Sequence, residues 1–271
     1  PPEVPMRVAS LQHDIAWEEP SETRRGVMEM LESIELPAGS LLLLPELGDT
    51  GFSFDIDRIA GLDGVAWARA LAQTRGIHVQ FGHAERGPEG LGRNRATIVS
   101  PRGDEVASYD KIHPFSFAGE DRVYRGGDRL VLVEMGDFTV CPLVCYDLRF
   151  PELWRLATLA GAEVFTIGAS WPAKRAGHWR SLLVARAIEN QAFVVACNRV
   201  GSDPSNRYAG GSMVIDPAGE VLAEGGDGAA CLVAELDRQR LLDWRATFPA
   251  IADVRRGFLG EISIDRRSTS C

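Results

Sequence analysis

The sequence predicts an α/β fold in a single domain. Segments with the apolar pattern of buried strands alternate with segments that have the apolar spacing of helices. Some strands are apolar along most of their length, such as residues 40–46 (SLLLLPE) and 163–170 (EVFTIGAS), which is typical of a sheet covered on its outer face. No linker rich in Pro, Ser and Gly interrupts the alternation, so we expect residues 1–271 to form one domain.

Two helices are expected in the first half of the chain. The first follows an initial strand; Ser21 can cap it, and Pro37 and Gly39 are expected to end it. The second is predicted over residues 64–75, where apolar residues recur at helical spacing. The strands expected in this half are residues 7–12 (RVASLQ), 40–46 and 77–85 (IHVQFGHAE).

Two short segments resemble each other and are expected to form hairpins. Residues 98–106 (IVSPRGDEV) and 214–222 (VIDPAGEVL) each have the pattern strand, Pro-x-Gly turn, strand. In such a turn Pro fixes φ, and Gly allows a left-handed residue. The likeness is short, but it fits a chain built from two similar halves.

The second half is expected to continue the alternation. Helices are predicted over residues 151–161, from about 178 to 190 and from about 238 to 246. The strands expected between them are residues 129–135 (RLVLVEM), 140–144, 163–170 and 192–198 (AFVVACN).

Composition and charge exclude several classes of protein. Lys and Arg number 29 and Asp and Glu 38, so the net charge is −9 and the pI is near 5.2, which argues against binding to nucleic acid or to an anionic membrane. No apolar stretch reaches the length of a membrane span, and the first residues lack the pattern of a signal peptide. We therefore expect a cytoplasmic protein with no nucleic-acid or membrane partner.

The cysteines predict neither a disulfide framework nor a metal site. Their number is odd, their spacing is irregular and no CxxC pair occurs, which fits a reducing compartment. Cys141 and Cys145 could share a metal, but no cluster of His or Cys supplies the remaining ligands. The cysteines are Cys141, Cys145, Cys197, Cys231 and Cys271.

Cys145 is expected in a turn between a strand and a helix. The apolar run Val140 to Val144 precedes it, and Pro151 opens the next helical pattern. Such turns can hold a nucleophile at the mouth of a site, with backbone N–H groups beside it. A single cysteine is more often a small buried apolar residue, so its role depends on the other ionisable residues.

Glu46, Lys111 and Cys145 each follow a predicted strand. Taken alone they could be a helix cap, a solvated charge and a core residue. Together they can perform nucleophilic catalysis: a carboxylate takes the thiol proton, the sulfur attacks a carbonyl carbon, and an ammonium stabilises the oxyanion. A nearby lysine favours the thiolate, and burial favours a carboxylate that exchanges protons near neutral pH.

The segments around these residues resemble the nitrilase superfamily of carbon–nitrogen hydrolases. The order of the glutamate, lysine and cysteine motifs also matches, and the resemblance extends over nearly the whole chain. The branch that the chain most resembles is that of the ω-amidases, which hydrolyse the terminal amide of 2-oxo acids such as 2-oxoglutaramate and 2-oxosuccinamate. The matching segments are LLLPE, YDKIHPF, LVCYDLRFPEL, ARAIENQAFVVACNRVG (185–201) and GGSMVIDPAGEVL.

The resemblance implies a four-layer α-β-β-α sandwich of the nitrilase type that forms a homodimer through helices near the nucleophile. It implies that Cys145 is the nucleophile, Glu46 the general base and Lys111 the oxyanion stabiliser. Glu120 matches an additional glutamate that orients the lysine or the substrate, and the backbone N–H of Tyr146 would complete the oxyanion hole. The resemblance further implies a reaction that passes through a thioester, releases ammonia and requires no metal or organic cofactor.

Arg149 matches the arginine that binds the substrate carboxylate in ω-amidases. A guanidinium can hold a carboxylate by two parallel hydrogen bonds, which supports this role on physical grounds. The alternative is a structural ion pair between Arg149 and Asp147 or Glu152.

The substrate pocket is less specified by the sequence. The loop at 170–179 (SWPAKRAGHW) departs from the animal ω-amidases, which carry threonines there, so Lys174 or Arg175 could serve in carboxylate binding instead. His178 is interpreted as structural, since the chemistry leaves no proton transfer for it. Three aromatic residues could line the pocket or equally pack in the core: Phe52, Phe115 and Trp171.

Other functions stay open from the sequence. One is a related amidase or an N-carbamoyl amino acid hydrolase with a different acyl group. Another is a scaffold that keeps the fold without turnover. A third is a Cys–His–acid hydrolase, whose base would be one of the histidines His13, His78, His83, His113 and His178.

Overall fold

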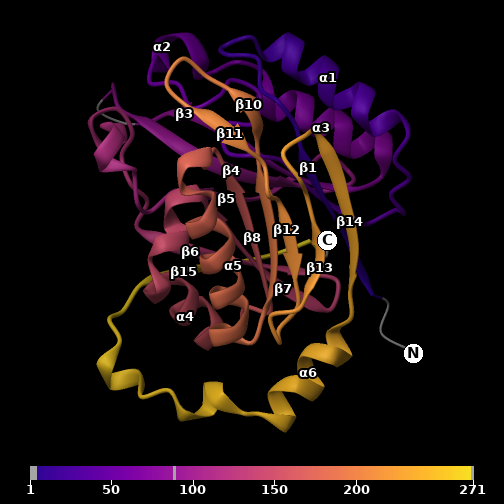
Figure 1. The fold of residues 1–271 in the computed structure, drawn as a ribbon, viewed down its shortest axis with the longest axis vertical. Helices are drawn as coiled ribbons and strands as arrows, with labels where there is room; N and C mark the ends of the chain where they lie inside the picture. Colours follow the sequence, from indigo (N-terminus) through magenta and orange to yellow (C-terminus); the bar gives the residue numbers. More distant parts are fainter. Residues whose placement is uncertain (1–4, 88–89, 270–271) are drawn as a thin grey trace.

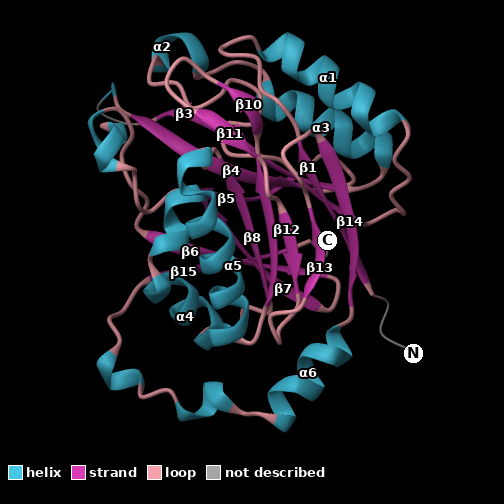
Figure 2. Cartoon of the chain, viewed as in Figure 1, coloured by secondary structure: helices cyan, strands magenta, loops and turns pink. Residues whose placement is uncertain are grey.

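The computed structural model describes residues 5–87 and 90–269. Two large sheets pack face to face, and helices cover both outer faces (Figure 1, Figure 2). This is the four-layer α-β-β-α sandwich that the resemblance implied. The first sheet has the order β14-β1-β2-β3-β4-β5. Its strands are β1 (Met6–Gln12), β2 (Leu41–Leu43), β3 (His78–Arg86), β4 (Gly92–Val99), β5 (Glu105–Asp110) and β14 (Ala230–Leu236).

The second sheet has the order β13-β12-β9-β8-β7-β6-β15. Its strands are β6 (Arg129–Met135), β7 (Phe138–Val144), β8 (Val164–Ala169), β9 (Phe193–Asn198), β12 (Met213–Ile215), β13 (Val221–Glu224) and β15 (Ser263–Ser268). A separate pair, β10 (Val200–Ser202) and β11 (Arg207–Ala209), forms a small hairpin.

The two sheets have the same internal layout. In the first, the strands β1, β2 and β3 run parallel and the hairpin β4–β5 follows them; in the second, β7, β8 and β9 run parallel and the hairpin β12–β13 follows. An antiparallel strand flanks each parallel set, β14 beside β1 and β6 beside β7. The expectation of two hairpins in two similar halves is confirmed.

The helices form the outer layers. In Figure 1, α1 and α3 lie over the first sheet, α4 and α5 lie over the second, and the yellow C-terminal segment passes from α6 around one end to β15. The 3₁₀ segments that matter for the site are η2 (Ser116–Ala118), η3 (Glu120–Arg122), η4 (Cys145–Arg149) and η5 (Ala173–Arg175). The helices are α1 (Pro20–Glu32), α2 (Ile56–Ile59), α3 (Gly64–Arg75), α4 (Pro151–Leu159), α5 (Ala176–Asn190) and α6 (Arg238–Thr247).

The run of leucines before Glu46 is buried on both faces of the first sheet. Leu41 and Leu43 belong to the core between the two sheets, and Leu42 and Leu44 pack under α1 and α3. Because side chains alternate along a strand, a strand between two layers must be apolar at every position. The strand itself is shorter than expected, because Pro45 has no N–H to continue the ladder.

The expected cap of the first helix is wrong. Glu19 occupies the N-cap without a side-chain hydrogen bond, and Pro20 is the first helical residue, so Ser21 lies inside the helix. Proline suits this position because its φ is already helical and its missing N–H has no partner there. The helix ends at Glu32, before the expected Pro37 and Gly39.

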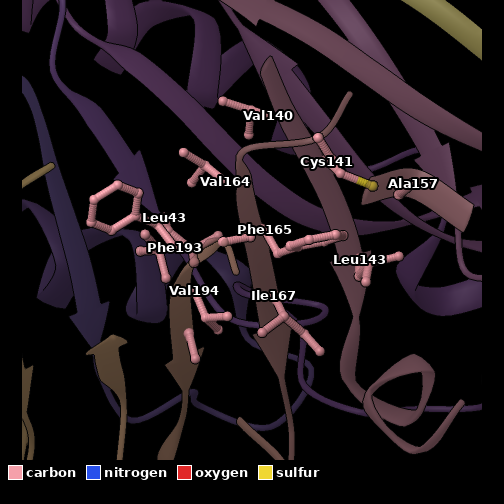
Figure 3. Close-up of a cluster of buried hydrophobic side chains, with 14 of the residues drawn as sticks. Leu43, Val140, Cys141, Leu143, Ala157, Val164, Phe165, Ile167, Phe193 and Val194 are labelled. Atoms are coloured by element: carbon pink, nitrogen blue, oxygen red, sulfur yellow. The ribbon is translucent and has the colours of Figure 1, made fainter. Parts of the chain in front are cut away.

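The largest core cluster fills the space between the two sheets and the space between the second sheet and the helices α4 and α5. Figure 3 shows residues of β7, β8 and β9 in this cluster, with the sulfur of Cys141 directed toward Ala157 of α4. Cys141, Cys145, Cys197 and Cys231 are free thiols, and Cys271 lies outside the described residues. No helix in the described ranges is both long and apolar enough to cross a membrane.

Candidate active site

Glu46, Lys111 and Cys145 meet at one end of the sandwich. Glu46 follows β2, Lys111 follows β5 and Cys145 follows β7, so the segments that leave three different strands converge there. In open α/β sheets the carboxyl ends of parallel strands are the usual place of a ligand crevice. Ser170, at the end of β8, adds its backbone N–H to the group.

Cys145 lies in a strained turn between β7 and α4, as the sequence predicted. Its φ is 44°, in the left-handed region that residues with a Cβ rarely adopt. The buried carboxylate of Asp147 holds this turn. One oxygen accepts hydrogen bonds from the Tyr109 hydroxyl (2.8 Å) and the Val144 N–H (3.2 Å), and the other accepts the His113 N–H (3.0 Å).

Replacing Asp147 by Ala is expected to lower the free energy of unfolding by about 3–5 kcal/mol, because two buried donors and one part-buried donor would lose their acceptor. Urea unfolding measures the change. Asp137→Ala, at an exposed aspartate between β6 and β7, is the matched control and should change stability by less than about 0.5 kcal/mol. Equal stability of the two variants would contradict this role of Asp147.

Lys111 joins two buried carboxylates. Its Nζ donates to Oε1 of Glu46 (2.7 Å) and to both carboxylate oxygens of Glu120 (3.0 and 2.8 Å). The Asn94 amide nitrogen links the same two acids, at 2.8 Å from Glu46 and 2.9 Å from Glu120. The backbone N–H of Phe115 donates to the second oxygen of Glu120 (2.5 Å). All three protons of the ammonium are therefore engaged by carboxylate oxygens.

The charges of this network perturb one another. Burial alone would lower the pKa of Lys111, but Glu120 and Glu46 outweigh it and raise that pKa well above its usual value. Burial also raises the pKa of Glu120, against the opposing charge of Lys111. Glu46 adds to the same rise through its negative charge. Lys111 stays protonated as a fixed positive charge between two acids.

The thiol of Cys145 is not activated by Lys111 alone. Burial and the negative charge of Glu46 raise the pKa of Cys145 well above its usual value, and Lys111 only partly opposes them. A hydrogen bond to Glu46 favours the thiol further. Lys111 favours the thiolate as expected, because its charge lowers the pKa of Cys145, but burial and Glu46 outweigh it. The proton therefore stays on sulfur, beside a carboxylate that can accept it.

Two glycines leave room for the backbone of Glu46. A Cβ at Gly82 would lie 2.6 Å from the Pro45 carbonyl oxygen, and a Cβ at Gly168 would lie 2.7 Å from the Leu44 carbonyl oxygen. Both distances are too short for any larger residue without a backbone shift. Gly82 of β3 and Gly168 of β8 thus bracket Glu46 and fix its position from both sheets.

A cavity of about 310 Å³ opens above Cys145. All of the aromatic residues and cations that the sequence put forward for the pocket line it, while Glu120 lies behind Lys111 and is fully buried. The Nζ of Lys111 is 5.3 Å from the ring centroid of Phe52. The lining residues at issue are Phe52, Phe115, Tyr146, Arg149, Trp171, Lys174 and Arg175.

Arg149 contacts no acid among the residues with described positions. Its guanidinium lies over the ring of Trp171, 4.8 Å from the centroid, and its Nη2 is 3.2 Å from Nδ1 of His178. The alternative of an ion pair with Asp147 or Glu152 is wrong, because Asp147 is engaged by buried donors and no described ion pair includes Glu152. Arg149 therefore presents an uncompensated positive charge to the cavity.

The loop before α5 adds two more cations to the rim. The guanidinium of Arg175 lies over the ring of Phe115, 5.2 Å from the centroid, and Lys174 is exposed. The Trp171 indole N–H donates to the Arg175 carbonyl (2.9 Å) and holds the loop. Within the described ranges neither cation has an ion-pair partner. The rim is thus positive although the whole chain carries a net charge of −9.

The histidines do not supply a base for Cys145. Those among the described residues are absent from the cavity lining, and His13 is buried between two carbonyl oxygens of Leu11 and Gly48. His113 stacks on Phe150 and contacts Asp147. In the described ranges no group of three His, Cys, Asp or Glu side chains could hold a metal ion. The geometry gives the Cys–His–acid alternative no support.

The structure adds residues that the sequence did not single out. Asn94 bridges the two acids, and Ser170 donates its N–H to Oε2 of Glu46 (3.0 Å). Tyr208, with Ser205 and Asn206, closes the cavity from the β10–β11 hairpin. Asn94 follows no apolar run of its own and lies mid-strand in β4, so no sequence signal pointed to it. Ser170 ends a predicted strand, which was the one available signal.

Known proteins resemble this chain over most of its length. Residues 7–246 match the model of the carbon–nitrogen hydrolase family. The chain is 38% identical to a 2-oxoglutaramate amidase of Bacillus subtilis (strain 168), an alignment that covers 92% of this chain and 97% of the relative. It is also 38% identical to the omega-amidase YafV of Escherichia coli (strain K12), over 92% of this chain and 96% of that protein.

Solved structures share the fold. The crystal structure of XC1258 from Xanthomonas campestris, a CN-hydrolase superfamily protein with an arsenic adduct in its active site, superposes with a TM-score of 0.87. It is 34% identical and covers 93% of this chain and 98% of its own. A mutant amidase of Nesterenkonia sp. AN1, with the acetamide moiety of fluoroacetamide added covalently at its active-site cysteine, gives a TM-score of 0.80 at 25% identity, over 95% of this chain and 97% of that one.

Proposed function

The chain belongs to the carbon–nitrogen hydrolase family, and from this we propose that it hydrolyses the terminal amide of a small 2-oxo acid, such as 2-oxoglutaramate or 2-oxosuccinamate. The names of the relatives support this substrate class. The observation that carries the proposal is the cavity itself, which is lined by Cys145, Glu46 and Lys111 and also by Arg149 with its uncompensated charge. A substrate with an amide at one end and a carboxylate at the other fits this lining, with the amide at Cys145 and the carboxylate at Arg149.

The first half of the reaction forms a thioester. The Cys145 proton passes to Glu46 as the sulfur attacks the amide carbon, and the carbonyl π electrons move to oxygen. Collapse of this adduct breaks the C–N bond, and ammonia leaves with the proton that Glu46 returns. Proton transfer must accompany attack, because burial and Glu46 keep the pKa of Cys145 high and the resting group is a thiol.

Lys111 and Tyr146 stabilise the oxyanion in this mechanism. In the resting site all three protons of the ammonium point at carboxylate oxygens. Once Glu46 accepts the thiol proton, it becomes a weaker acceptor and releases one Lys111 N–H toward the new negative charge. The backbone N–H of Tyr146, at the start of the strained turn, supplies the second donor. Glu120 lies behind Lys111 and holds it in place through hydrogen bonds from the ammonium to both of its carboxylate oxygens.

The second half hydrolyses the thioester. Water attacks the acyl carbon and gives a proton to Glu46, and the carbon–sulfur bond breaks as the proton returns to Cys145. The sum is amide plus water to carboxylic acid plus ammonia, with all atoms and electrons supplied by these groups. No step needs a metal or an organic cofactor.

Arg149 holds the substrate carboxylate in this proposal. Its side chain has five N–H donors, of which the contact with His178 uses one, so a bidentate pair of donors stays available. The aromatic rings of Phe52, Phe115 and Trp171 form the apolar walls between this anchor and Cys145.

The proposal extends to the assembly and the setting of the protein. Residues 1–271 act as one hydrolase domain, in support of which both sheets share one core cluster. The chain forms a homodimer through the helices beside Cys145; on α5, Ile188 is 51% exposed, as an interface residue would be in a single chain. The free thiols fit the reducing cytoplasm. Light scattering of the protein as it elutes from a size-exclusion column gives its mass in solution and tests the dimer.

Ammonia release from a set of amides tests the function. We expect 2-oxoglutaramate and 2-oxosuccinamate to be hydrolysed with a kcat/KM at least about 10²-fold above those of glutamine and asparagine, whose ammonium group would face Arg149, Lys174 and Arg175. N-carbamoyl amino acids test the related hydrolase. A preference for them, or no ammonia from any compound, would overturn the proposal.

A further inference from the structure

We propose that His178 is a positioning residue for Arg149, and that protonation of His178 releases Arg149 and weakens binding of an anionic amide. The inference rests on the proposed function, since it takes the substrate to carry a carboxylate. Its basis is the contact of 3.2 Å between Nη2 of Arg149 and Nδ1 of His178, at the rim of the cavity.

The direction of this hydrogen bond fixes the state of the imidazole. A guanidinium has donors only and stays charged at any physiological pH. Nδ1 of His178 must therefore be the acceptor, so the ring is neutral and carries its proton on Nε2. A second proton on Nδ1 would remove the acceptor and place a positive charge against the guanidinium.

No other polar group among the described residues replaces His178 as a partner of the Arg149 side chain. The remaining contact is the face of Trp171, which constrains the plane of the guanidinium but not its rotation within that plane. His178 thus selects the rotation in which the free N–H groups face the cavity. Without it, Arg149 keeps its charge but loses this orientation.

Cations of η4 and η5 lie near His178. Lys174 and Arg175 precede it in the chain, and Arg149 faces it from η4. On its own helix, Arg180 pairs with Glu224.

Among the described residues, no acid on the adjoining elements forms an ion pair with His178. Asp147 of η4 is buried under Tyr109, Val144 and His113. Glu152, in the first turn of α4, forms no ion pair with a described residue. Asp203, in the loop that closes the cavity, accepts the Tyr208 hydroxyl.

The test compares two variants. An asparagine at this position can place its Oδ1 where Nδ1 lies, so His178→Asn keeps the acceptor but does not titrate, whereas His178→Ala removes it. We expect the wild-type KM for 2-oxoglutaramate to rise about tenfold between pH 8 and pH 5.5, the range over which imidazoles titrate. His178→Asn should keep the wild-type KM of pH 8 at every pH. His178→Ala should show the raised KM at every pH, with kcat within about twofold of wild type.

A neutral amide of similar length, butyramide, separates positioning from damage to the site. Its KM should not respond to either variant, because it has no carboxylate for Arg149. Arg149→Met should raise the KM for 2-oxoglutaramate more than His178→Ala does, and abolish its pH dependence. If the wild type releases ammonia but the KM of His178→Asn still depends on pH, the role of His178 is overturned and the proposed function stands. Absence of activity on every carboxylate-bearing amide would overturn the proposed function and this inference together.

Discussion

Replacing Cys145 by Ala is expected to lower kcat for amide hydrolysis by at least about 10⁴-fold, because Cys145 supplies the only thiol among the described residues of the cavity. The fold should persist, since the change removes one sulfur atom and alanine tolerates the turn no worse than cysteine does. Loss of activity with an unchanged unfolding midpoint is the expected pattern.

Intact-mass analysis with a slowly hydrolysed amide shows the intermediate directly. The wild type should gain the mass of the acyl group, and Cys145→Ala should not. Cys141→Ala is the matched control: this thiol lies on β7, the strand that leads to Cys145, but is buried against α4, and burial raises its pKa far above the usual value (Figure 3). The control should keep both the adduct and the activity. An adduct on Cys145→Ala would assign the nucleophile elsewhere.

The sequence was informative where one residue's neighbours along the chain decide its environment. The apolar runs before Glu46 and Cys145 predicted buried strands, and Pro151 marked the start of α4. The cap of α1 was missed because both Ser21 and Pro20 are favoured near a helix start, and the geometry of proline decided between them.

Contacts between segments that lie far apart in the sequence could not be predicted in the same way. Asn94 meets Glu46 and Glu120 only because β4 lies beside β3 in the folded sheet. The link between Arg149 and His178 joins η4 to α5, and nothing in the spacing of the two residues indicates it. Arg149 is interpreted from the sequence as the carboxylate-binding residue, with an ion pair as the alternative, and His178 as structural. Neither interpretation includes their contact.

The sign of the electrostatic effect on Cys145 also needed the structure. A lysine near a cysteine favours the thiolate, and the sequence could suggest only that Lys111 and Cys145 lie near each other. The structure shows that Lys111 is already bound by two acids and that one of them, Glu46, contacts the thiol. Burial, and after it the charge of Glu46, raises the pKa of Cys145 more than Lys111 lowers it, so the proton stays on sulfur.

Glu46→Gln is expected to change two properties in opposite directions: amide hydrolysis becomes slower, and the Cys145 thiol becomes more reactive toward alkylation. Hydrolysis should fall by about 10²–10⁴-fold in kcat, because the proposed mechanism loses the base that accepts the thiol proton and later activates water. A Cys–His–acid enzyme would keep most of its activity. Glu152→Gln, at an exposed carboxylate on α4, is the control and should leave kcat unchanged.

The reactivity of Cys145 should change in the other direction. In the wild type, burial and then the charge and hydrogen bond of Glu46 raise the pKa of Cys145, while Lys111 lowers it. Removing the charge of Glu46 leaves burial opposed by Lys111, so the pKa of the thiol falls. The rate of alkylation by iodoacetamide, measured against pH, should therefore reach its midpoint at a lower pH in Glu46→Gln than in the wild type. Such a variant would form its thiolate more readily and yet hydrolyse amides more slowly. This result would show that Glu46 contributes by transferring protons, to the leaving group and from water, and not by supplying a thiolate. A midpoint that moves to higher pH would instead show that Glu46 stabilises the thiolate, and the proposed coupling of attack to proton transfer would be wrong.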